Sequence, residues 1–272
     1  MRFQREVTAA VLIPAVLAVL VLAPRWAFSL LVAAAACVAL LEFYALLAAG
    51  GWFVPRAAGL VLFAALLAAA HLAAPAALLA LTAATLLLLP TLVMFASPAE
   101  AVLLPSSAGA VFATLYVALG ASSIIGLRAH GWQPVVFLFA VVWAGDSAAY
   151  YVGRRWGKRK LAPVVSPKKT WEGLWGQLAG GTLFGAAAAF LIAPGARGTA
   201  SVALAGAAFG LVVSATAVVG DLVESTFKRS VAVKDSGGLL PGHGGLLDRL
   251  DSLLYASPVL LFVLTFAPGG PR

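Results

Sequence analysis

The chain of 272 residues is short of charge: only 10% of its residues are Asp, Glu, Lys or Arg, while 62% are apolar. Such a composition leaves too few polar side chains to cover a soluble domain of this size, which excludes an ordinary water-soluble protein. The chain also has a single cysteine, Cys37, which excludes a disulfide framework and a thiolate metal site. Its apolar segments do not alternate with polar residues, which disfavours a membrane strand barrel.

Long apolar runs take the place of a polar surface, and each run has about 20 residues, the length that a helix needs to cross a bilayer. We therefore expect an all-α, polytopic integral membrane helix bundle with about nine spans. The spans are predicted near residues 7–23, 27–48, 57–73, 76–96, 107–127, 134–153, 174–193, 200–223 and 250–267. The boundary between the third and fourth spans is the least defined, because both are rich in Ala and Leu.

Two local features of these spans leave alternatives open. The first apolar run follows two arginines, as in a signal peptide, but it lacks a small-x-small cleavage site, which favours an uncleaved first span. Small residues in spans 174–193 and 200–223 suggest close helix packing in lipid. The Ala-rich composition of the whole chain explains these small residues equally well.

The basic residues are divided unevenly between the two sides of the predicted bundle. With the N-terminus inside, fourteen of the 18 Lys and Arg residues face the cytoplasm and four face outward. This asymmetry predicts a cytoplasmic N-terminus and an odd number of spans. We expect an N-terminal membrane region at residues 1–132 and a catalytic region at residues 133–272, whose polar loops 154–173 and 224–249 are cytoplasmic.

Asp146 is a carboxylate within an apolar span, in the sequence W-A-G-D-S-A-A-Y, about two helical turns before the cytoplasmic end. A carboxylate at that depth is costly and usually functional. Tyr150 follows four residues later and can share its helix face. The alternative is a carboxylate that pairs with a neighbouring helix for packing alone.

The 154–173 loop carries seven of the Lys and Arg residues. As a group they are explained by a positive-inside patch that holds anionic lipid headgroups. The sequence S-P-K-K-T-W-E-G is more specific, because Ser166 and Pro167 fit the N-cap and first position of a helix. Lys168 and Lys169 would then lie beside free backbone N–H groups, an arrangement that suits phosphate.

More carboxylates lie at the predicted cytoplasmic ends of the last two spans. Asp221, Ser225 and Lys228 have the spacing of residues on one helix face. Asp248 and Asp251 open the last span, three residues apart, and an acid is favoured at a helix N-terminus. Capping explains one of these two acids but not both.

The predicted topology brings these acids, the 154–173 loop and the glycine-rich 224–249 loop to the same side of the membrane. Carboxylate oxygens are hard ligands for Mg²⁺, which normally shares a few carboxylates with substrate phosphates. Lysines and glycine-loop amides suit the phosphates themselves. The pattern indicates metal-assisted phosphoryl or nucleotidyl transfer at the cytosolic face of a membrane.

Residues 225–251 resemble the signature of the phosphatidate cytidylyltransferase (CDP-diacylglycerol synthase) family. That signature reads S-x-Φ-K-R-x4-K-D-x-small-x2-Φ-P-x-H-G-G-Φ-x-D-R-Φ-D, where Φ is apolar, and the chain matches it at every fixed position. Further landmarks of the family resemble residues 143–150, 166–173 and 220–225. The first five spans are generic and add nothing to the resemblance.

The resemblance implies a reaction of CTP with phosphatidic acid, with Mg²⁺ and with room for a second cation, at the cytoplasmic face of a cell's inner membrane. It implies no nucleic-acid partner and leaves a homodimer open. The implied catalytic residues are Asp146, Asp221, Lys234, Asp248 and Asp251, with Asp221 and Asp248 as metal ligands. The implied phosphate- and CTP-binding residues are Ser166, Lys168, Lys169, Thr170, Ser225, Lys228, Arg229, His243, Gly244, Gly245 and Arg249. His243 is a poor candidate for a general base, since a phosphate nucleophile is already deprotonated at neutral pH.

Two other functions remain as alternatives. A CTP-dependent lipid kinase would share the site chemistry but would transfer the γ-phosphate to an alcohol. A transporter would place its acids near the bilayer midplane, in broken helices of paired repeats. The clustering of the acids at one face argues against the transporter.

Overall fold

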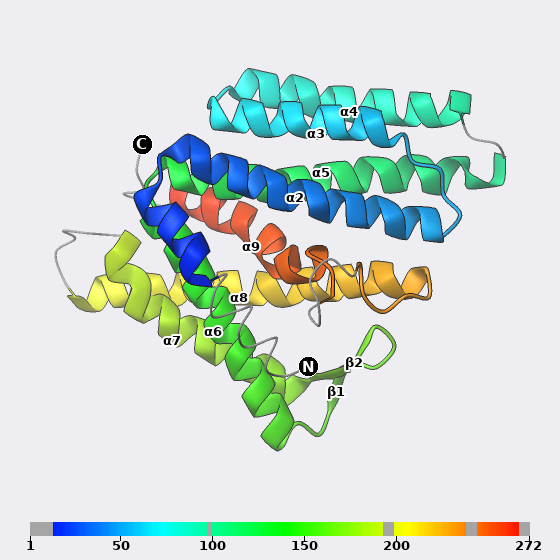
Figure 1. Cartoon of the computed structure of the whole chain (residues 1–272). Helices are drawn as coiled ribbons and strands as arrows, with labels where there is room; N and C mark the ends of the chain where they lie inside the picture. Colours follow the sequence, from blue (N-terminus) through cyan, green and yellow to red (C-terminus); the bar gives the residue numbers. More distant parts are fainter. Residues whose placement is uncertain (1–12, 97–99, 193–198, 238–243, 267–272) are drawn as a thin grey trace. The chain divides into compact units, whose positions relative to one another are not determined.

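The computed structural model describes residues 13–96, 100–192, 199–237 and 244–266, and helices dominate these segments (Figure 1). In chain order, the elements are a helix at Ile13–Leu22, α2 (Arg25–Ala49), α3 (Arg56–His71), α4 (Pro75–Ala96), η1 (Glu100–Val102), α5 (Leu103–Ala129), α6 (Gln133–Trp156), β1 (Lys160–Ala162), β2 (Ser166–Thr170), α7 (Trp171–Ile192), α8 (Thr199–Ser230) and α9 (Leu247–Phe266).

Six helical segments of the described residues are long and apolar enough to cross a membrane: α2, α4, η1 with α5, α6, α8 and α9. The helix Ile13–Leu22 and α3 are apolar but shorter, and α7 has 22 residues. The all-α, polytopic membrane class is confirmed. The count of nine spans and the cytoplasmic N-terminus stay predictions.

The chain divides into two compact units. Unit 1 holds Met1–Gly126 and Phe227–Leu250, and unit 2 holds Leu127–Thr226 and Asp251–Arg272. Most of the 225–251 motif therefore belongs to the same unit as the N-terminal helices. The sequence analysis expected regions at 1–132 and 133–272 and did not place residues 227–250 with the N-terminal helices. Contacts between segments far apart in the sequence produce this grouping.

In unit 1, α2 is tied to both α3 and α5. The hydroxyl of Tyr44 lies 2.6 Å from Oγ1 of Thr114 on α5. Ser29 Oγ lies 3.0 Å from Nδ1 of His71 at the end of α3. The backbone carbonyl oxygen of His71 accepts a hydrogen bond from Arg25 at 2.8 Å. Figure 1 shows α3 and α4 side by side. These contacts hold α2 in place between its neighbours.

In unit 2, glycines let α7 pack closely on both α6 and α8. A Cβ atom on Gly180 of α7 would lie 2.8 Å from Cβ of Ala148 on α6. A Cβ atom on Gly185 would lie 2.7 Å from Cα of Gly210 on α8. The helix backbones are thus too close for larger side chains at these positions. Close packing through small residues is confirmed for this pair of spans.

Within the predicted 154–173 loop, a short antiparallel hairpin lies between the end of α6 at Trp156 and the beginning of α7 at Trp171. Lys160 of β1 lies opposite Thr170 of β2, and Ala162 lies opposite Ser166. An irregularity in the register separates the two pairs. Residues 160–170 are therefore an ordered arm, while residues 154–156 belong to α6 and residues 171–173 to α7.

The expectation that Ser166 and Pro167 begin a helix is wrong, since both lie in β2 and α7 begins at Trp171. The physical reason is that a residue before proline is pushed toward extended conformations. Thr170 is the cap instead, because its Oγ1 accepts the backbone N–H of Gly173 at 3.1 Å.

Candidate functional site

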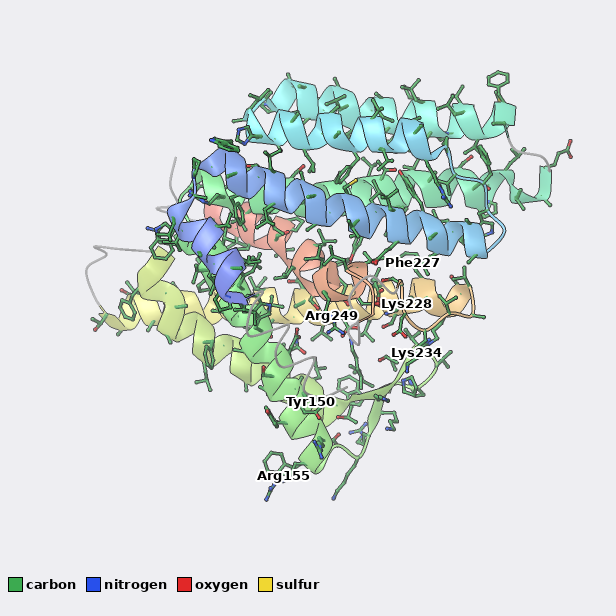
Figure 2. All side chains as sticks on the ribbon, in the orientation of Figure 1. Tyr150, Arg155, Phe227, Lys228, Lys234 and Arg249 are labelled. Carbon is green, nitrogen blue, oxygen red and sulfur yellow. The ribbon has the colours of Figure 1, made fainter. Side chains whose placement is uncertain are left out.

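In unit 1, an ion pair joins two parts of the 225–251 motif that lie 20 residues apart. The ammonium of Lys228 on α8 is 2.5 Å from Oδ1 of Asp248 in the first turn of α9, and each side chain is only 10% exposed. Figure 2 shows Lys228 on α8, beside the beginning of α9 where Arg249 is labelled. A pair this well shielded from water leaves a poorly solvated charge if one partner is removed.

The second oxygen of Asp248 holds the chain on either side of the glycine-rich segment. Oδ2 accepts hydrogen bonds from the backbone N–H of Ser236 at 3.0 Å, from its hydroxyl at 3.0 Å and from the N–H of Gly245 at 2.9 Å. Gly244 has a φ of 79°, a conformation that glycine adopts without strain. Both oxygens of Asp248 are therefore engaged by donors of its own unit.

Glu42 of α2 accepts further hydrogen bonds from the same segment. Its donors are the backbone N–H groups of Leu246 and Leu247, and the Ser236 hydroxyl lies 3.1 Å from Oε2, so that Glu42 and Asp248 share its single hydrogen. The sequence analysis did not single out Glu42. Glu42 could have been found in the same way as Asp146, because it too is a carboxylate inside an apolar run.

Aromatic rings fix the end of α8 that carries Lys228. Phe43 of α2 lies against Phe227, with ring centroids 5.1 Å apart, and Phe112 of α5 lies 5.0 Å from the same ring. Phe112 also stacks on Tyr116 at 5.5 Å. The residue preceding Lys228 is thus packed between α2 and α5, which orients the lysine.

In unit 2, Lys169 of the hairpin forms an ion pair with Asp221 of α8, with Nζ 2.7 Å from Oδ2. The side chains are 22% and 40% exposed, respectively. The hydroxyl of Ser225, one turn further along α8, donates to Oδ1 of Asp221 at 3.3 Å. The predicted shared face of Asp221 and Ser225 is confirmed by this contact.

Asp146 on α6 accepts a hydrogen bond from Nε2 of Gln177 on α7 at 2.8 Å. The hydroxyl of Tyr150 accepts a hydrogen bond from Arg154 at 3.2 Å instead of pairing with Asp146. Sequence reasoning missed Gln177, although a single amide in an apolar helix is a detectable signal. The hydrogen bond joins α6 to α7.

Carboxylates from three helices gather in unit 2. Asp251 of α9 is 7% exposed and lies within electrostatic range of Asp221, Glu224 and Asp146. Glu224 is 2% exposed. Like charges this close disfavour one another, and a bound cation would relieve that repulsion.

The donor chemistry of this acid group fits a hard divalent cation such as Mg²⁺. Among the described residues, no three or more His, Cys, Asp or Glu side chains already surround a metal position. That finding is compatible with Mg²⁺, which takes one or two carboxylates and completes its shell with water and substrate phosphates. Asp248 differs from these acids, because its Oδ1 is already paired with the ammonium group of Lys228.

Glu172 in the first turn of α7 closes the base of the hairpin. Its carboxylate accepts the backbone N–H of Lys158 at 3.0 Å and that of Arg159 at 3.3 Å. The hydrogen bond from Lys158 is the main cause that lowers the pKa of Glu172 below its ordinary value. The carboxylate therefore stays ionised while it holds the arm that carries Lys169.

The other residues with predicted roles differ in their exposure, and one of them lies outside the described segments. Ser166 is half-buried and Thr170 is buried. Arg229 donates to the carbonyl oxygen of Val233 at 2.8 Å. His243 lies outside the described residues. The exposed predicted phosphate ligands are Lys168, Arg229, Lys234 and Arg249.

Some of the predicted site residues form two groups, one in each unit, together with Glu42, Ser236, Gln177 and Glu224, which were not predicted. The unit 1 cluster consists of Glu42, Lys228, Ser236, Gly245 and Asp248. The unit 2 cluster consists of Asp146, Lys169, Gln177, Asp221, Glu224, Ser225 and Asp251. Both groups combine acids with lysine, a composition that suits the binding of phosphates and of the cations that accompany them.

A family model described as the cytidylyltransferase family matches residues 3–267 of the chain. Curated relatives carry the name phosphatidate cytidylyltransferase. The relative from Brucella suis is 45% identical over 162 residues, which are 59% of this chain and 57% of that protein.

A relative from Haemophilus influenzae is 44% identical over 140 residues, covering 50% of this chain and 47% of that protein. A relative from Mycobacterium tuberculosis is 39% identical over 160 residues, covering 58% of this chain and 46% of that protein. The chain spans about half the length of the curated relatives it matches.

Proposed function

Because the chain belongs to the cytidylyltransferase family, we propose that it is a phosphatidate cytidylyltransferase of phospholipid biosynthesis. The substrates are CTP and phosphatidic acid, and the products are CDP-diacylglycerol and pyrophosphate. The observation that carries this proposal is the cluster of Lys228, Gly245 and Asp248. These fixed positions of the family signature meet in one hydrogen-bonded group.

The proposed chemistry requires no protein nucleophile. A phosphate oxygen of phosphatidic acid attacks the α-phosphorus of CTP. The bond from that phosphorus to the oxygen bridging toward the β-phosphorus breaks, and pyrophosphate leaves with the electron pair. Both reactants are anions, so positioning and charge neutralisation dominate the barrier. The acceptor phosphate is already ionised near neutral pH and needs no general base.

The acids are assigned to cation binding. Asp221 and Asp248 are the proposed Mg²⁺ ligands, and Asp248 would exchange its Lys228 contact for the cation. Asp146 and Asp251 support them or orient what they bind, and a second cation fits the same proposal. When bound, Mg²⁺ would neutralise charge on the phosphates. The gathering of carboxylates around Asp251 supports this assignment for unit 2.

The basic residues are assigned to the phosphates of the two substrates. Lys169 already pairs with an acid of the unit 2 cluster and Lys228 with Asp248. The proposed neutralising residues are Lys168, Lys169, Lys228, Arg229, Lys234 and Arg249, and Ser166, Thr170, Ser225, His243, Gly244 and Gly245 complete the proposed phosphate and nucleotide contacts.

The test of the reaction uses purified protein, phosphatidic acid vesicles, Mg²⁺ and CTP labelled at the α-phosphate. The proposal requires label in the lipid phase and release of pyrophosphate. Label that stays in water as CDP while a lipid alcohol becomes phosphorylated would show a lipid kinase instead. Chelation of divalent cations by EDTA should stop the transfer, and added Mg²⁺ should restore it.

We also propose nine spans, a cytoplasmic N-terminus and an active site at the cytoplasmic face of the inner membrane. The proposal is compatible with a homodimer. The distribution of basic residues supports this orientation. Cysteines introduced as Arg159→Cys and Asp235→Cys, both at exposed positions, in a Cys37→Ala background, should react with an impermeant thiol reagent only from the cytoplasmic side. Labelling from outside intact cells would overturn the orientation.

A further inference from the structure

Glu42 lies in α2, which sequence reasoning treated as a generic span, yet it contacts the signature segment at three points. Oε1 accepts the N–H of Leu246 at 3.0 Å. Oε2 accepts the N–H of Leu247 at 2.8 Å and lies 3.1 Å from the hydroxyl of Ser236. We propose that Glu42 is a positioning residue, which holds Ser236 and the beginning of α9 so that Asp248 keeps its working orientation.

The first support is the backbone that Glu42 satisfies. The N–H groups at the start of a helix have no partner within the helix. Leu246 and Leu247 lie at the start of α9, and Glu42 supplies acceptors to both from another helix. Its negative charge also suits the positive end of the helix dipole. Glu42 therefore acts on the turn of helix that contains Asp248.

The second support is the hydroxyl of Ser236, which lies between two carboxylates. Ser236 Oγ is 3.1 Å from Oε2 of Glu42 and 3.0 Å from Oδ2 of Asp248. Ser236 is 6% exposed, so its hydroxyl has little access to water. A shift of Glu42 is therefore transmitted through Ser236 to Asp248.

The third support is the close fit around Glu42. A Cβ atom on Gly237 would lie 2.8 Å from Cδ of Glu42, and a Cβ atom on Gly245 would lie 2.8 Å from the backbone N of Gly237. Side chains at these two positions would push the segment away from α2. Gly237 and Gly245 thus permit the carboxylate to reach the backbone.

The fourth support is the neighbouring residue on α2. Phe43 packs on Phe227, next to Lys228, the ion-pair partner of Asp248. Two consecutive residues of α2 therefore contact both ends of the described signature segment. A carboxylate within an apolar helix is costly unless its contacts compensate for the cost, and within the described part of the chain the hydrogen bonds of Glu42 go to this segment.

The experiment compares Glu42→Gln with Glu100→Gln, the same change at an exposed glutamate of unit 1. Glutamine keeps the shape of the side chain, but its amide group turns a donor toward the N–H of Leu246 or of Leu247. Hydrogen exchange of the amides at 244–248 reports the contact without any assay of activity. Glu42→Gln should speed this exchange and leave exchange in the rest of α9 unchanged, while Glu100→Gln should leave both unchanged.

The functional arm rests on the proposed phosphatidate cytidylyltransferase activity. Glu42→Gln should lower kcat about 10- to 100-fold per folded molecule, the range expected for a lost hydrogen bond to a charged group. Ser236→Ala should lower it as well, and the double variant should lose no more than the worse single variant, since both act through one chain of contacts. A merely structural role would reduce the folded fraction and leave kcat per folded molecule unchanged.

The two arms separate the failure of this inference from the failure of the proposed function. Unchanged exchange at 244–248 in Glu42→Gln, or fully additive losses with Ser236→Ala, would overturn the positioning role. A wild-type protein that forms no CDP-diacylglycerol would overturn the proposed function and the catalytic consequence with it, whatever the exchange data show. Faster exchange with a non-additive loss of kcat supports the inference.

Discussion

The unit 1 cluster and the unit 2 cluster balance their carboxylates in different ways. In unit 1, the oxygens of Asp248 and Glu42 accept hydrogen bonds from backbone N–H groups, Ser236 and Lys228. In unit 2, Asp251 is shielded from water among Asp221, Glu224 and Asp146. In the first arrangement an ion pair and several N–H donors surround two carboxylates, while the second gathers more carboxylates around the ion pair of Lys169 with Asp221.

This difference suggests a division of labour within the proposed function. A carboxylate whose oxygens are held by its own chain is well placed to fix geometry. A group of acids that repel one another is suited to a cation supplied from solution. Replacing Asp248 of the unit 1 cluster should therefore lower both stability and activity, while replacing Asp221 of the unit 2 cluster should lower activity alone.

The largest effect is expected for Asp248→Asn, which should lower both activity and stability. The change leaves Lys228 without a carboxylate in a site only 10% exposed, a loss that typically costs about 3–5 kcal/mol. Turnover should fall below detection. Chemical unfolding in detergent measures the stability. A variant with wild-type stability would show that the Lys228–Asp248 ion pair does not stabilise the fold.

Asp221→Asn should abolish turnover while leaving the protein as stable as the wild type. Loss of a proposed metal ligand should reduce the rate at least about 1000-fold, equivalent to about 4 kcal/mol. Its ion pair with Lys169 is partly exposed, and such pairs contribute only about 0–1 kcal/mol to folding. Near-normal turnover with saturating Mg²⁺ would exclude Asp221 as a ligand.

Lys169→Ala should lower the rate about 30- to 1000-fold, the cost of roughly 2–4 kcal/mol expected for a charge-assisted contact made in the transition state. Lys168→Ala should also lower the rate, but by less, because Lys168 is exposed while Lys169 contacts Asp221. Lys169→Arg should restore the charge without full activity, since the planar guanidinium does not reproduce the ammonium geometry. Rates measured at equal amounts of inserted protein test this order, and two silent alanine variants would assign both lysines to lipid contact.

The smallest effect is expected for Thr170→Ala, which removes the cap of α7 and should destabilise the hairpin arm by about 1 kcal/mol. Thr170→Ser keeps a hydroxyl and should retain most of the stability. Thr226→Ala is a matched control, because Thr226 is exposed and bonds only to its own helix at Leu222. Thermal unfolding in detergent compares the three, and equal shifts for Thr170→Ala and Thr226→Ala would contradict the capping role.

Much of the candidate site was predictable because its residues break a strong local pattern. Asp146, Asp221 and Asp251 stand out as acids in apolar segments, and Lys228 and Asp248 occupy fixed positions of the family signature. Glu42 breaks the same pattern but lies far from any motif, so its role was missed. The hairpin at 160–170 was also missed, because capping preferences at Ser166 and Pro167 competed with the extended bias before proline.

Composition and motif spacing were enough to predict the membrane class, the predominance of helices and the family, since long apolar runs and closely spaced polar motifs are local properties of the chain. Three features follow only from how the folded chain packs. Glu42 accepts a hydrogen bond from Leu247, 205 residues away, and residues 227–250 group with the N-terminal helices. Lys169, and not Lys168, pairs with Asp221. Such pairings depend on how helices pack, and an Ala- and Leu-rich span carries little information about its neighbours until close contact and hydrogen bonding select them.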